Sequence, residues 1–235
     1  MHFFFLPAIT GEEVTLSPEE SRHCISVLRC KKNDQIRLIN GEGVLANAVI
    51  LKPDTTGTKV RVIEKIVDYR KRNNHLHIAI APTKKADRFE WFLEKATEIG
   101  IDEITPLICS RSERPRINME RASRIIIGAM KQSQRAFLPK LNPLQDFRSF
   151  ITDNRCKSKI ITHCNSQALP RIAKSLIPIT PVAIMVGPEG DFTMEEVNQA
   201  TIQGFRAASL GGFVYRTETA GIMACHLFNL IYDQL

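Results

Sequence analysis

Strand-like and helix-like patterns alternate along the chain from residue 75 onward, and this alternation restricts the possible folds more than any other feature. Short apolar runs at 76–81 and 182–186 are typical of buried strands. The stretch 87–99 places its apolar side chains on one helical face and is followed by Gly100. Strands and helices alternating at this spacing predict a parallel α/β sheet covered on both faces.

The same criteria extend the alternation to the end of the chain. Asp87 and Glu90 have the spacing of a capping box at the start of the first helix, and Thr193 and Glu196 have it at a later one. Further strands are predicted at 101–108, 159–164 and 205–210, and further helices at 119–134, from 193, and from about 217 to the end.

The first seventy residues have a different organisation, with several short strands and one helix. Ser17-Pro18-Glu19-Glu20 combines an N-cap, a first-turn proline and an acidic residue at N3, so a helix is predicted from there. Asn40-Gly41 predicts a hairpin turn. Strands are predicted at 2–6, 35–39, 44–51 and 59–67. This content suits a small β-barrel. The polar segment 69–74 separates two predicted domains, 1–70 and 74–235.

Composition excludes several classes of protein. Hydrophobic residues make up 43% and charged residues 24% of the 235 residues, which is ordinary for a globular protein. No apolar run approaches the roughly 18 residues of a membrane span, and the start lacks a signal-peptide pattern, so we expect a cytoplasmic protein without a membrane partner. The six cysteines contain no C-x-x-C pair. We therefore expect reduced thiols and no metal site.

Positive charge is concentrated in one segment. The formal net charge is +7, and residues 111–140 hold most of the excess. The basic residues there are Arg111, Arg114, Arg116, Arg121, Arg124, Lys131, Arg135 and Lys140. An arginine-rich patch suits bidentate phosphate contacts, although a solvated helix face explains a lone basic cluster equally well.

Standard nucleotide motifs are missing, and the remaining candidates follow late strands. Neither a P-loop nor a G-x-G-x-x-G fingerprint is present. His75 and His77 share one strand face and are interpreted as exposed. Gly187-Pro188-Glu189-Gly190 directly follows the strand 182–186, and Gly211-Gly212 follows the strand 205–210. Ligands in open α/β sheets bind outside such strand ends. His163-Cys164, at another strand end, could contact a ligand, and ordinary packing is slightly favoured for Cys164.

These strand-end residues carry a family resemblance. Gly187–Gly190 with Phe192, then Leu210-Gly211, then Arg216-Thr217-Glu218-Thr219-Ala220, resemble the signature of the RsmE-type 16S ribosomal RNA uracil-N3 methyltransferases of the SPOUT superfamily. Earlier blocks resemble the same family, so the likeness covers nearly the whole chain. They are His23, Val27, Leu28 and Arg29; Lys95, Ala96, Glu98 and Gly100; and Arg111, Gln132, Ser133, Arg135 and Pro139.

The resemblance implies a fold, a reaction and partners. It implies an N-terminal PUA-like β-barrel for RNA and a C-terminal α/β domain with a trefoil knot. It also implies S-adenosylmethionine as cofactor, a homodimer, and methylation of N3 of a specific uridine in 16S ribosomal RNA of the small subunit. The sites expected are catalytic Arg216 and Glu218; cofactor-binding Gly187, Pro188, Glu189, Gly190, Leu210, Gly211, Val214 and Thr217; and RNA-binding Arg22, Arg29, Arg111, Arg114, Arg116, Arg124 and Arg135. Glu189 has the alternative role of capping the following helix.

The sequence departs from the family pattern at a few positions. Asp191 stands where a second glycine is usual, Phe213 and Tyr215 stand where Arg and Leu are expected, and Lys131 replaces an acidic residue. Two alternatives therefore stay open. One is a SPOUT methyltransferase acting on another RNA base or a ribose 2′-hydroxyl. The other is a catalytically inactive RNA-binding factor for ribosome assembly.

Overall fold

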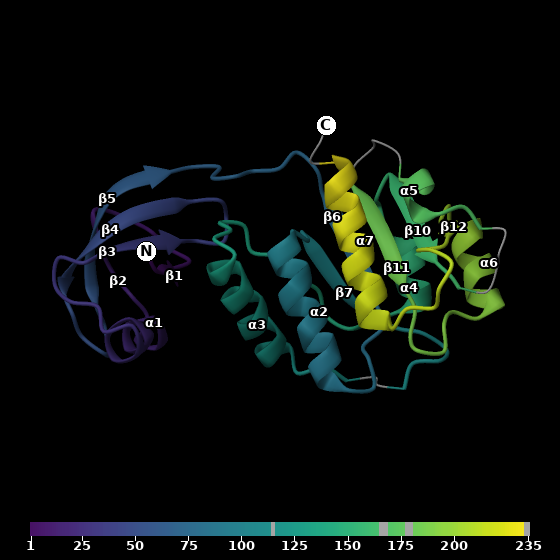
Figure 1. The fold of residues 1–235 in the computed structure, drawn as a ribbon, viewed down its shortest axis with the longest axis horizontal. Coiled ribbons are helices and arrows are strands. Elements are labelled where there is room, and N and C mark those ends of the chain that lie inside the picture. Colours follow the sequence, from purple (N-terminus) through teal and green to yellow (C-terminus); the bar gives the residue numbers. More distant parts are fainter. Residues whose placement is uncertain (114–115, 165–168, 177–180, 233–235) are drawn as a thin grey trace. The chain divides into compact units, whose positions relative to one another are not determined.

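The computed structural model describes residues 1–113, 116–164, 169–176 and 181–232, which form two compact units. The first unit comprises 1–72 together with 127–138, and the second comprises 73–126 and 139–235. The boundary near residue 72 falls in the polar segment 69–74 (Figure 1). Among the described helices, none combines the length and the apolar character that crossing a membrane requires.

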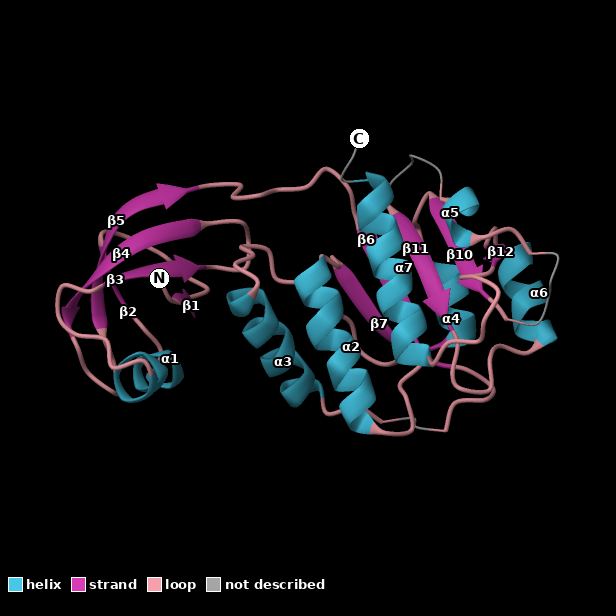
Figure 2. Cartoon of the chain, viewed as in Figure 1, coloured by secondary structure: helices cyan, strands magenta, loops and turns pink. Residues whose placement is uncertain are grey.

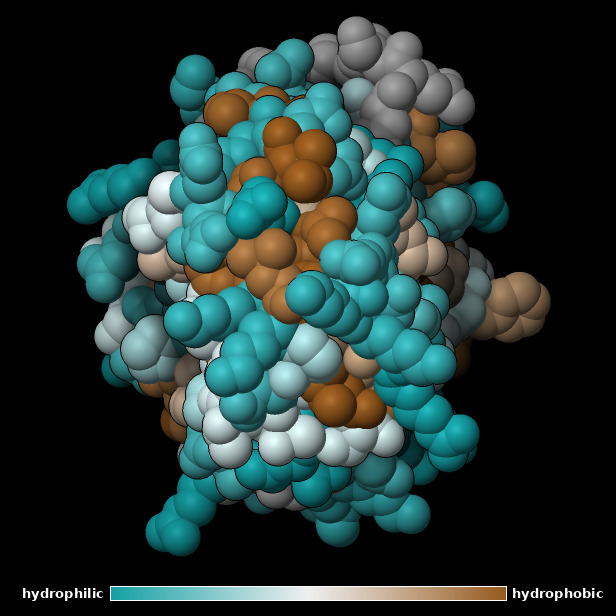
Figure 3. All heavy atoms as spheres, turned by 90° about the vertical axis from the view of Figure 1, so that its left-hand side faces the viewer, coloured by the Kyte–Doolittle hydropathy of each residue, from teal (hydrophilic) through white to brown (hydrophobic). Residues whose placement is uncertain are grey.

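The first unit is built on a five-stranded sheet with the order β1-β3-β4-β5-β2. β1 runs parallel to β3, and the other neighbours are antiparallel. Phe4, Leu38 and Ile50 are fully buried in its core. Figure 3 shows this unit from one side, with apolar side chains gathered among hydrophilic ones. Its elements are β1 (Phe3–Phe5), β2 (Glu13–Thr15), α1 (Pro18–Arg22), the π-helical turn η1 (His23–Val27), β3 (Gln35–Ile39), β4 (Leu45–Lys52) and β5 (Lys59–Ile66).

Two predicted local signals in this unit are confirmed. The Ser17 hydroxyl accepts a hydrogen bond from the Glu20 backbone N–H at 3.2 Å and begins α1. The Asn40 side-chain oxygen accepts from the backbone N–H groups of Glu42 and Val44, both at 2.9 Å, and closes the turn between β3 and β4. A Cβ atom added to Gly43 would lie 2.3 Å from the Phe137 ring, so only glycine fits there.

The second unit contains the expected parallel sheet, with strand order β12-β10-β11-β6-β7-β8 and β9 paired to β7 (Figure 2). All its strand pairs are parallel. Its strands are β6 (Leu76–Ile80), β7 (Glu103–Ile108), β8 (Lys140–Leu141), β9 (Gln145–Asp146), β10 (Ser158–Thr162), β11 (Val182–Val186) and β12 (Arg206–Ala208). Its helices are α2 (Ala86–Ile99), α4 (Phe147–Asp153), α5 (Ile172–Ser175), α6 (Met194–Ile202) and α7 (Thr217–Tyr232); α3 (Met119–Gln132) contributes residues to both units.

Helices cover both faces of this sheet. Alternate strand residues such as Ala79 and Met185 form one core with side chains of α4 and α6. On the other face, α7 packs against β6, β11 and α2. A Cβ atom on Gly221 would lie 2.6 Å from Phe92 and 2.8 Å from Ile80, so this glycine permits the close approach of α7. Residues 209–216 return the chain from the edge strand β12 to α7 over the middle of the sheet.

The structure corrects two expectations for this unit. His77 is buried rather than exposed, because β6 is an interior strand covered on both faces. The predicted capping box of Asp87 and Glu90 does not form, because Lys85 occupies the N-cap of α2 and no side chain caps it. The box of Thr193 and Glu196 is confirmed at α6. The short elements β2, β8, β9, α4 and α5 had no predicted counterpart.

Candidate active site

A cavity of about 580 Å³ lies where β10, β11 and β12 end. The loops after these strands line it, as expected for ligand binding in an open α/β sheet. All eight residues predicted to bind the cofactor line this one cavity: Gly187, Pro188, Glu189, Gly190, Leu210, Gly211, Val214 and Thr217. The structure therefore brings together two loops that are separated by about twenty residues in the sequence.

The loop after β11 is held in place by contacts with three other parts of the unit. The Gly187 carbonyl accepts a hydrogen bond from the Thr217 hydroxyl at 3.0 Å, which ties the loop to the start of α7. The Gly190 carbonyl accepts from the Arg111 guanidinium at 2.6 Å. The Glu189 carboxylate accepts from the Lys84 backbone N–H at 3.0 Å. The alternative role of Glu189 as a cap for α6 is wrong, because Thr193 and Glu196 cap that helix.

The end of β10 also belongs to the cavity, so Cys164 does more than the ordinary packing that its sequence position slightly favoured. Thr162, His163 and Cys164 line the cavity, together with Asp191 from the opposite loop. The His163 ring is buried, and the Cys164 backbone N–H donates to the Asp191 carboxylate at 2.9 Å. Asp191 adopts a φ of 61°, a left-handed conformation that suits the glycine usual in similar sequences. The position of these residues after a parallel strand was the available signal.

The two predicted catalytic residues lie at the start of α7, beside the cavity residue Thr217, but outside the described lining of the cavity. Arg216 is exposed to solvent. Glu218 is buried, and its Oε1 atom lies 3.7 Å from the Arg88 Nε atom of α2. Its Oε2 atom is also buried and has no hydrogen-bond partner among the described residues. A buried carboxylate oxygen without a donor can accept a proton or hydrogen bond from a bound molecule.

The predicted RNA-binding arginines are divided between the two units. Arg22 and Arg29 are exposed in the first unit, and Arg135, in the same unit, is half-buried. Arg111, Arg116 and Arg124 are exposed in the second. Arg111 is thus attached to the cavity loop through Gly190. Arg114 lies outside the described residues.

Cysteine chemistry contributes little at this site. Burial raises the pKa of Cys24 to about 12 and that of Cys156 to about 11, and it also raises the pKa values of Cys109 and Cys164. These thiols therefore stay protonated at neutral pH and are poor nucleophiles. Within the part of the chain that the structure describes, no group of three or more His, Cys, Asp or Glu residues could hold a metal ion.

Two family models match the chain. Residues 70–229 match an RNA methyltransferase domain, and residues 16–63 match an RNA methyltransferase PUA domain. The chain belongs to the RNA methyltransferase family. The first model covers most of the second unit of this RNA methyltransferase, including both loops that line the cavity.

Curated relatives agree with this assignment. The chain is 30% identical to the ribosomal RNA small subunit methyltransferase E of Rickettsia conorii, over 94% of this chain and 91% of that protein. It is 27% identical to the protein of the same name from Bacillus subtilis, over 92% and 87% of the two chains. The expected membership of the RsmE-type family is confirmed.

Solved structures show the same fold. A probable rRNA methyltransferase from Porphyromonas gingivalis matches with a TM-score of 0.91 and 35% identity over 100% of this chain and 99% of that one. The ribosomal RNA small subunit methyltransferase E of Neisseria gonorrhoeae, solved with bound S-adenosylmethionine, matches with a TM-score of 0.91 and 26% identity. The match covers 99% of this chain and 98% of that one. The expected fold class, a knotted SPOUT-type α/β domain with an N-terminal PUA-like barrel, is confirmed for this RNA methyltransferase.

Proposed function

We propose that this protein transfers a methyl group from S-adenosylmethionine to N3 of a specific uridine in 16S ribosomal RNA. One observation carries the proposal: all eight residues expected to bind the cofactor line a single cavity at the carboxyl ends of parallel strands. The names of the relatives, which specify small-subunit ribosomal RNA, support the substrate.

The cavity fits S-adenosylmethionine. Its volume of about 580 Å³ lies within the roughly 300–1,000 Å³ of small-molecule sites. Gly187 lets the loop pack closely against Phe192, because an added Cβ atom would lie 3.1 Å from the Phe192 ring. Bound S-adenosylmethionine supplies an electrophilic methyl group on its sulfonium. Gly187, Leu210 and Gly211 would hold it through backbone contacts, and Val214 and Thr217 would complete the wall. Solved structures of a Legionella pneumophila methyltransferase and of the Neisseria protein contain this cofactor.

The protein's own groups must align the uridine and deal with the proton on N3. Glu218 is the proposed proton acceptor or orienting group, because its buried Oε2 atom has no partner among the described residues. Arg88, 3.7 Å from the other carboxylate oxygen, balances the charge of Glu218. Arg216 would stabilise the uridine anion or a neighbouring phosphate, for which a guanidinium is suited.

The seven predicted RNA-binding arginines are proposed to hold the ribosomal RNA backbone. Phosphate contacts from Arg22, Arg29, Arg111, Arg116, Arg124 and Arg135, with Arg114, would position the RNA without reading its sequence. The target base would then leave its stack to enter the cavity. The same proposal places the protein in the cytoplasm, together with its ribosomal RNA.

A second copy of the chain is proposed to complete the site. Phe213 and Val214, on the loop that lines the cavity, are 81% and 83% exposed. Large apolar side chains at this exposure favour burial against a partner. A homodimer would cover them and bring residues of the second chain to the cavity. Analytical sedimentation measures the oligomeric state. We expect the unmodified protein to sediment as a dimer and Phe213→Asp to sediment as a monomer.

The decisive variant for the chemistry is Glu218→Gln. It keeps the shape of the side chain and removes its ability to take a proton. We expect turnover to fall about 100-fold or more while the affinity for S-adenosylmethionine stays unchanged. Unchanged turnover would remove Glu218 from acid–base chemistry. Calorimetry of the unmodified protein with S-adenosylmethionine separates an active enzyme from an inactive assembly factor, whose cavity would bind little.

A further inference from the structure

A second cavity, of about 820 Å³, lies at the other end of the same sheet. Its lining comes from the first parts of β6 and β7, from the segments 140–145 and 153–156, from Phe150, and from Pro181, directly before β11. Because the strands are parallel, their amino ends share one edge, opposite the edge that carries the S-adenosylmethionine cavity. The described residues that line the two cavities are entirely different. The second cavity is therefore a separate candidate site.

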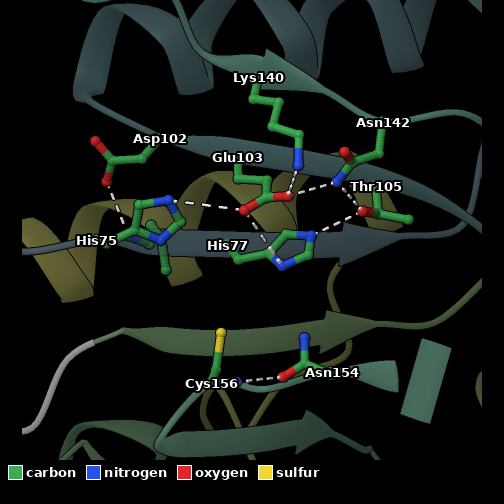
Figure 4. A network of polar contacts seen from close by, with 10 residues as sticks. His75, His77, Asp102, Glu103, Thr105, Lys140, Asn142, Asn154 and Cys156 are labelled. Atoms are coloured by element: carbon green, nitrogen blue, oxygen red, sulfur yellow. Dashed lines mark hydrogen bonds and ion pairs between the residues drawn. The ribbon is translucent and has the colours of Figure 1, made fainter. Parts of the chain in front are cut away.

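One wall of this cavity is a connected network of polar side chains (Figure 4). A His77 ring nitrogen lies 2.7 Å from the Thr105 hydroxyl. The Asn142 amide donates to Thr105 at 2.8 Å and to Glu103 at 2.7 Å, and the Lys140 ammonium donates to the same Glu103 oxygen at 2.9 Å. These bonds fix the side chains in one arrangement before any ligand arrives. A preorganised polar wall reduces the entropy lost on binding.

The cavity has no net preference for a charged ligand. Lys140 and Arg155 contribute two positive charges to its lining, and Glu103 and Asp153 contribute two negative ones. Burial lowers the pKa of His77 to about 4, so its ring is neutral at physiological pH. The Asn142 and Lys140 donors contribute to a lowered pKa for Glu103, which stays ionised. An uncharged polar molecule matches this balance better than a phosphate or an ammonium ion.

Asn154 leaves one donor available to a ligand. Its side chain is buried, and its oxygen accepts a hydrogen bond from the Cys156 backbone N–H at 3.0 Å. Its amide nitrogen donates no hydrogen bond among the described residues. In Figure 4 this nitrogen points toward the polar network that contains His77 and Thr105. The nitrogen is not among the buried atoms that lack a partner, so in the free protein water satisfies it, and the acceptor of a ligand can replace that water. This donor therefore marks where a ligand's acceptor would lie.

The remaining lining is apolar. Phe150, Leu144, Pro143 and Pro181 contribute to it. The Phe150 ring is buried and packs edge-to-face on His77, with centroids 5.3 Å apart. Flat heterocycles need apolar contacts for their faces and hydrogen-bonding groups for their edges. This cavity offers both.

We propose that this second cavity binds a nucleobase, with the Asn154 amide donating to an acceptor on its edge and Leu144 and Phe150 contacting the ring. Membership of the RNA methyltransferase family favours a base over other uncharged heterocycles. The base comes from a free nucleoside or from an unpaired position of the bound RNA. In the second case, the cavity anchors the RNA away from the site of methylation.

Calorimetry tests the proposal with the full chain and excess S-adenosylhomocysteine, which blocks the first cavity. One arm titrates each of the four nucleosides, and the other titrates a single-stranded RNA oligonucleotide. Asn154→Asp keeps the acceptor for Cys156 and removes the donor, and Leu144→Trp fills the cavity. Asn198→Asp, at an exposed position of α6, is the control for added charge.

We expect saturable binding that weakens at least ten-fold in Asn154→Asp and Leu144→Trp and is unchanged in Asn198→Asp. Binding of nucleosides identifies a free ligand, and binding of the oligonucleotide alone identifies a base of RNA. If Asn154→Asp does not fold, Leu144→Trp alone decides. Absence of binding in both arms, or binding that neither variant weakens, would overturn the proposal. S-adenosylmethionine affinity, measured separately, reports on the first cavity and stays unchanged in all three variants.

Discussion

The Nδ1 atom of His163 lies 2.8 Å from the Oδ2 atom of Asp191, and this close contact joins the end of β10 to the loop after β11. The Asp191 carboxylate also accepts hydrogen bonds from the backbone N–H groups of Cys164 and Phe192. The family resemblance predicts glycine at position 191. Here the carboxylate supplies contacts that a glycine cannot, and these contacts offset the cost of a φ of 61°.

Asp191→Ala therefore tests whether this connection shapes the cofactor cavity. Alanine keeps the left-handed strain and loses all the carboxylate contacts, so we expect the affinity for S-adenosylmethionine to fall about ten-fold, or about 1.4 kcal/mol. Calorimetry measures this. Asp191→Gly removes the strain as well and should recover part of the affinity. If Asp191→Ala bound the cofactor as well as the unmodified protein, the contacts of the Asp191 carboxylate would have no role in the cavity.

Gly221 is predicted to be essential for the packing of α7. In Gly221→Ala the new Cβ atom would lie 2.6 Å from Phe92 and 2.8 Å from Ile80, so we expect a loss of about 1–3 kcal/mol in the free energy of unfolding. Denaturant unfolding measures it. Gly128→Ala is the matched control, because its Cβ atom in α3 would meet nothing within 4 Å. That variant should gain up to about 1 kcal/mol from helix propensity. Equal effects in the two variants would contradict the packing argument.

His77 should make stability depend on pH. Its pKa is about 4 in the folded protein and about 6.5 when unfolded, because burial disfavours the charged ring. Between these values the unfolded state binds more protons, so the contribution of His77 is complete above pH 6.5 and is lost as pH falls toward 4. The loss is on the order of 3 kcal/mol. Chemical denaturation at pH 4.5 and 7 measures the free energy of unfolding at each pH. We expect the difference between the two values to be smaller in His77→Gln than in the unmodified protein. The same dependence in both proteins would refute this assignment.

Arg29 should contribute to RNA binding through charge alone. It is exposed, and each phosphate contact contributes roughly 0.9 to the slope of log affinity against log salt. We expect Arg29→Ala to reduce that slope by about one for a ribosomal RNA fragment, as measured by filter binding across salt concentrations. Arg61→Ala is the control, because Arg61 forms a salt bridge with Glu13 at 3.1 Å and is not among the arginines predicted to contact RNA. An unchanged slope for Arg29→Ala would mean that this side chain is only solvated.

Much of the second unit could be predicted from the sequence because its signals are local. Apolar runs identified β6 and β11, and Thr193 and Glu196 identified the start of α6. Glycine turns after parallel strands indicated where a ligand could bind, and the family resemblance supplied the residues that are proposed to bind the cofactor. The burial of His77 could not be predicted in this way, because it depends on which strands become neighbours. Asp191 contacts His163, which follows β10, and Glu218 contacts Arg88 of α2, and no local sequence pattern specifies such contacts.

The cavity formed by the loops after β11 and β12 is proposed to direct methyl transfer to uridine N3. The most direct measurement is mass-spectrometric nucleoside mapping of small-subunit ribosomal RNA after incubation with the protein and methyl-labelled S-adenosylmethionine. We predict labelled 3-methyluridine at a single position, and none with Glu218→Gln. Label on a ribose 2′-hydroxyl or another base, or no label although the cofactor binds, would contradict the claim.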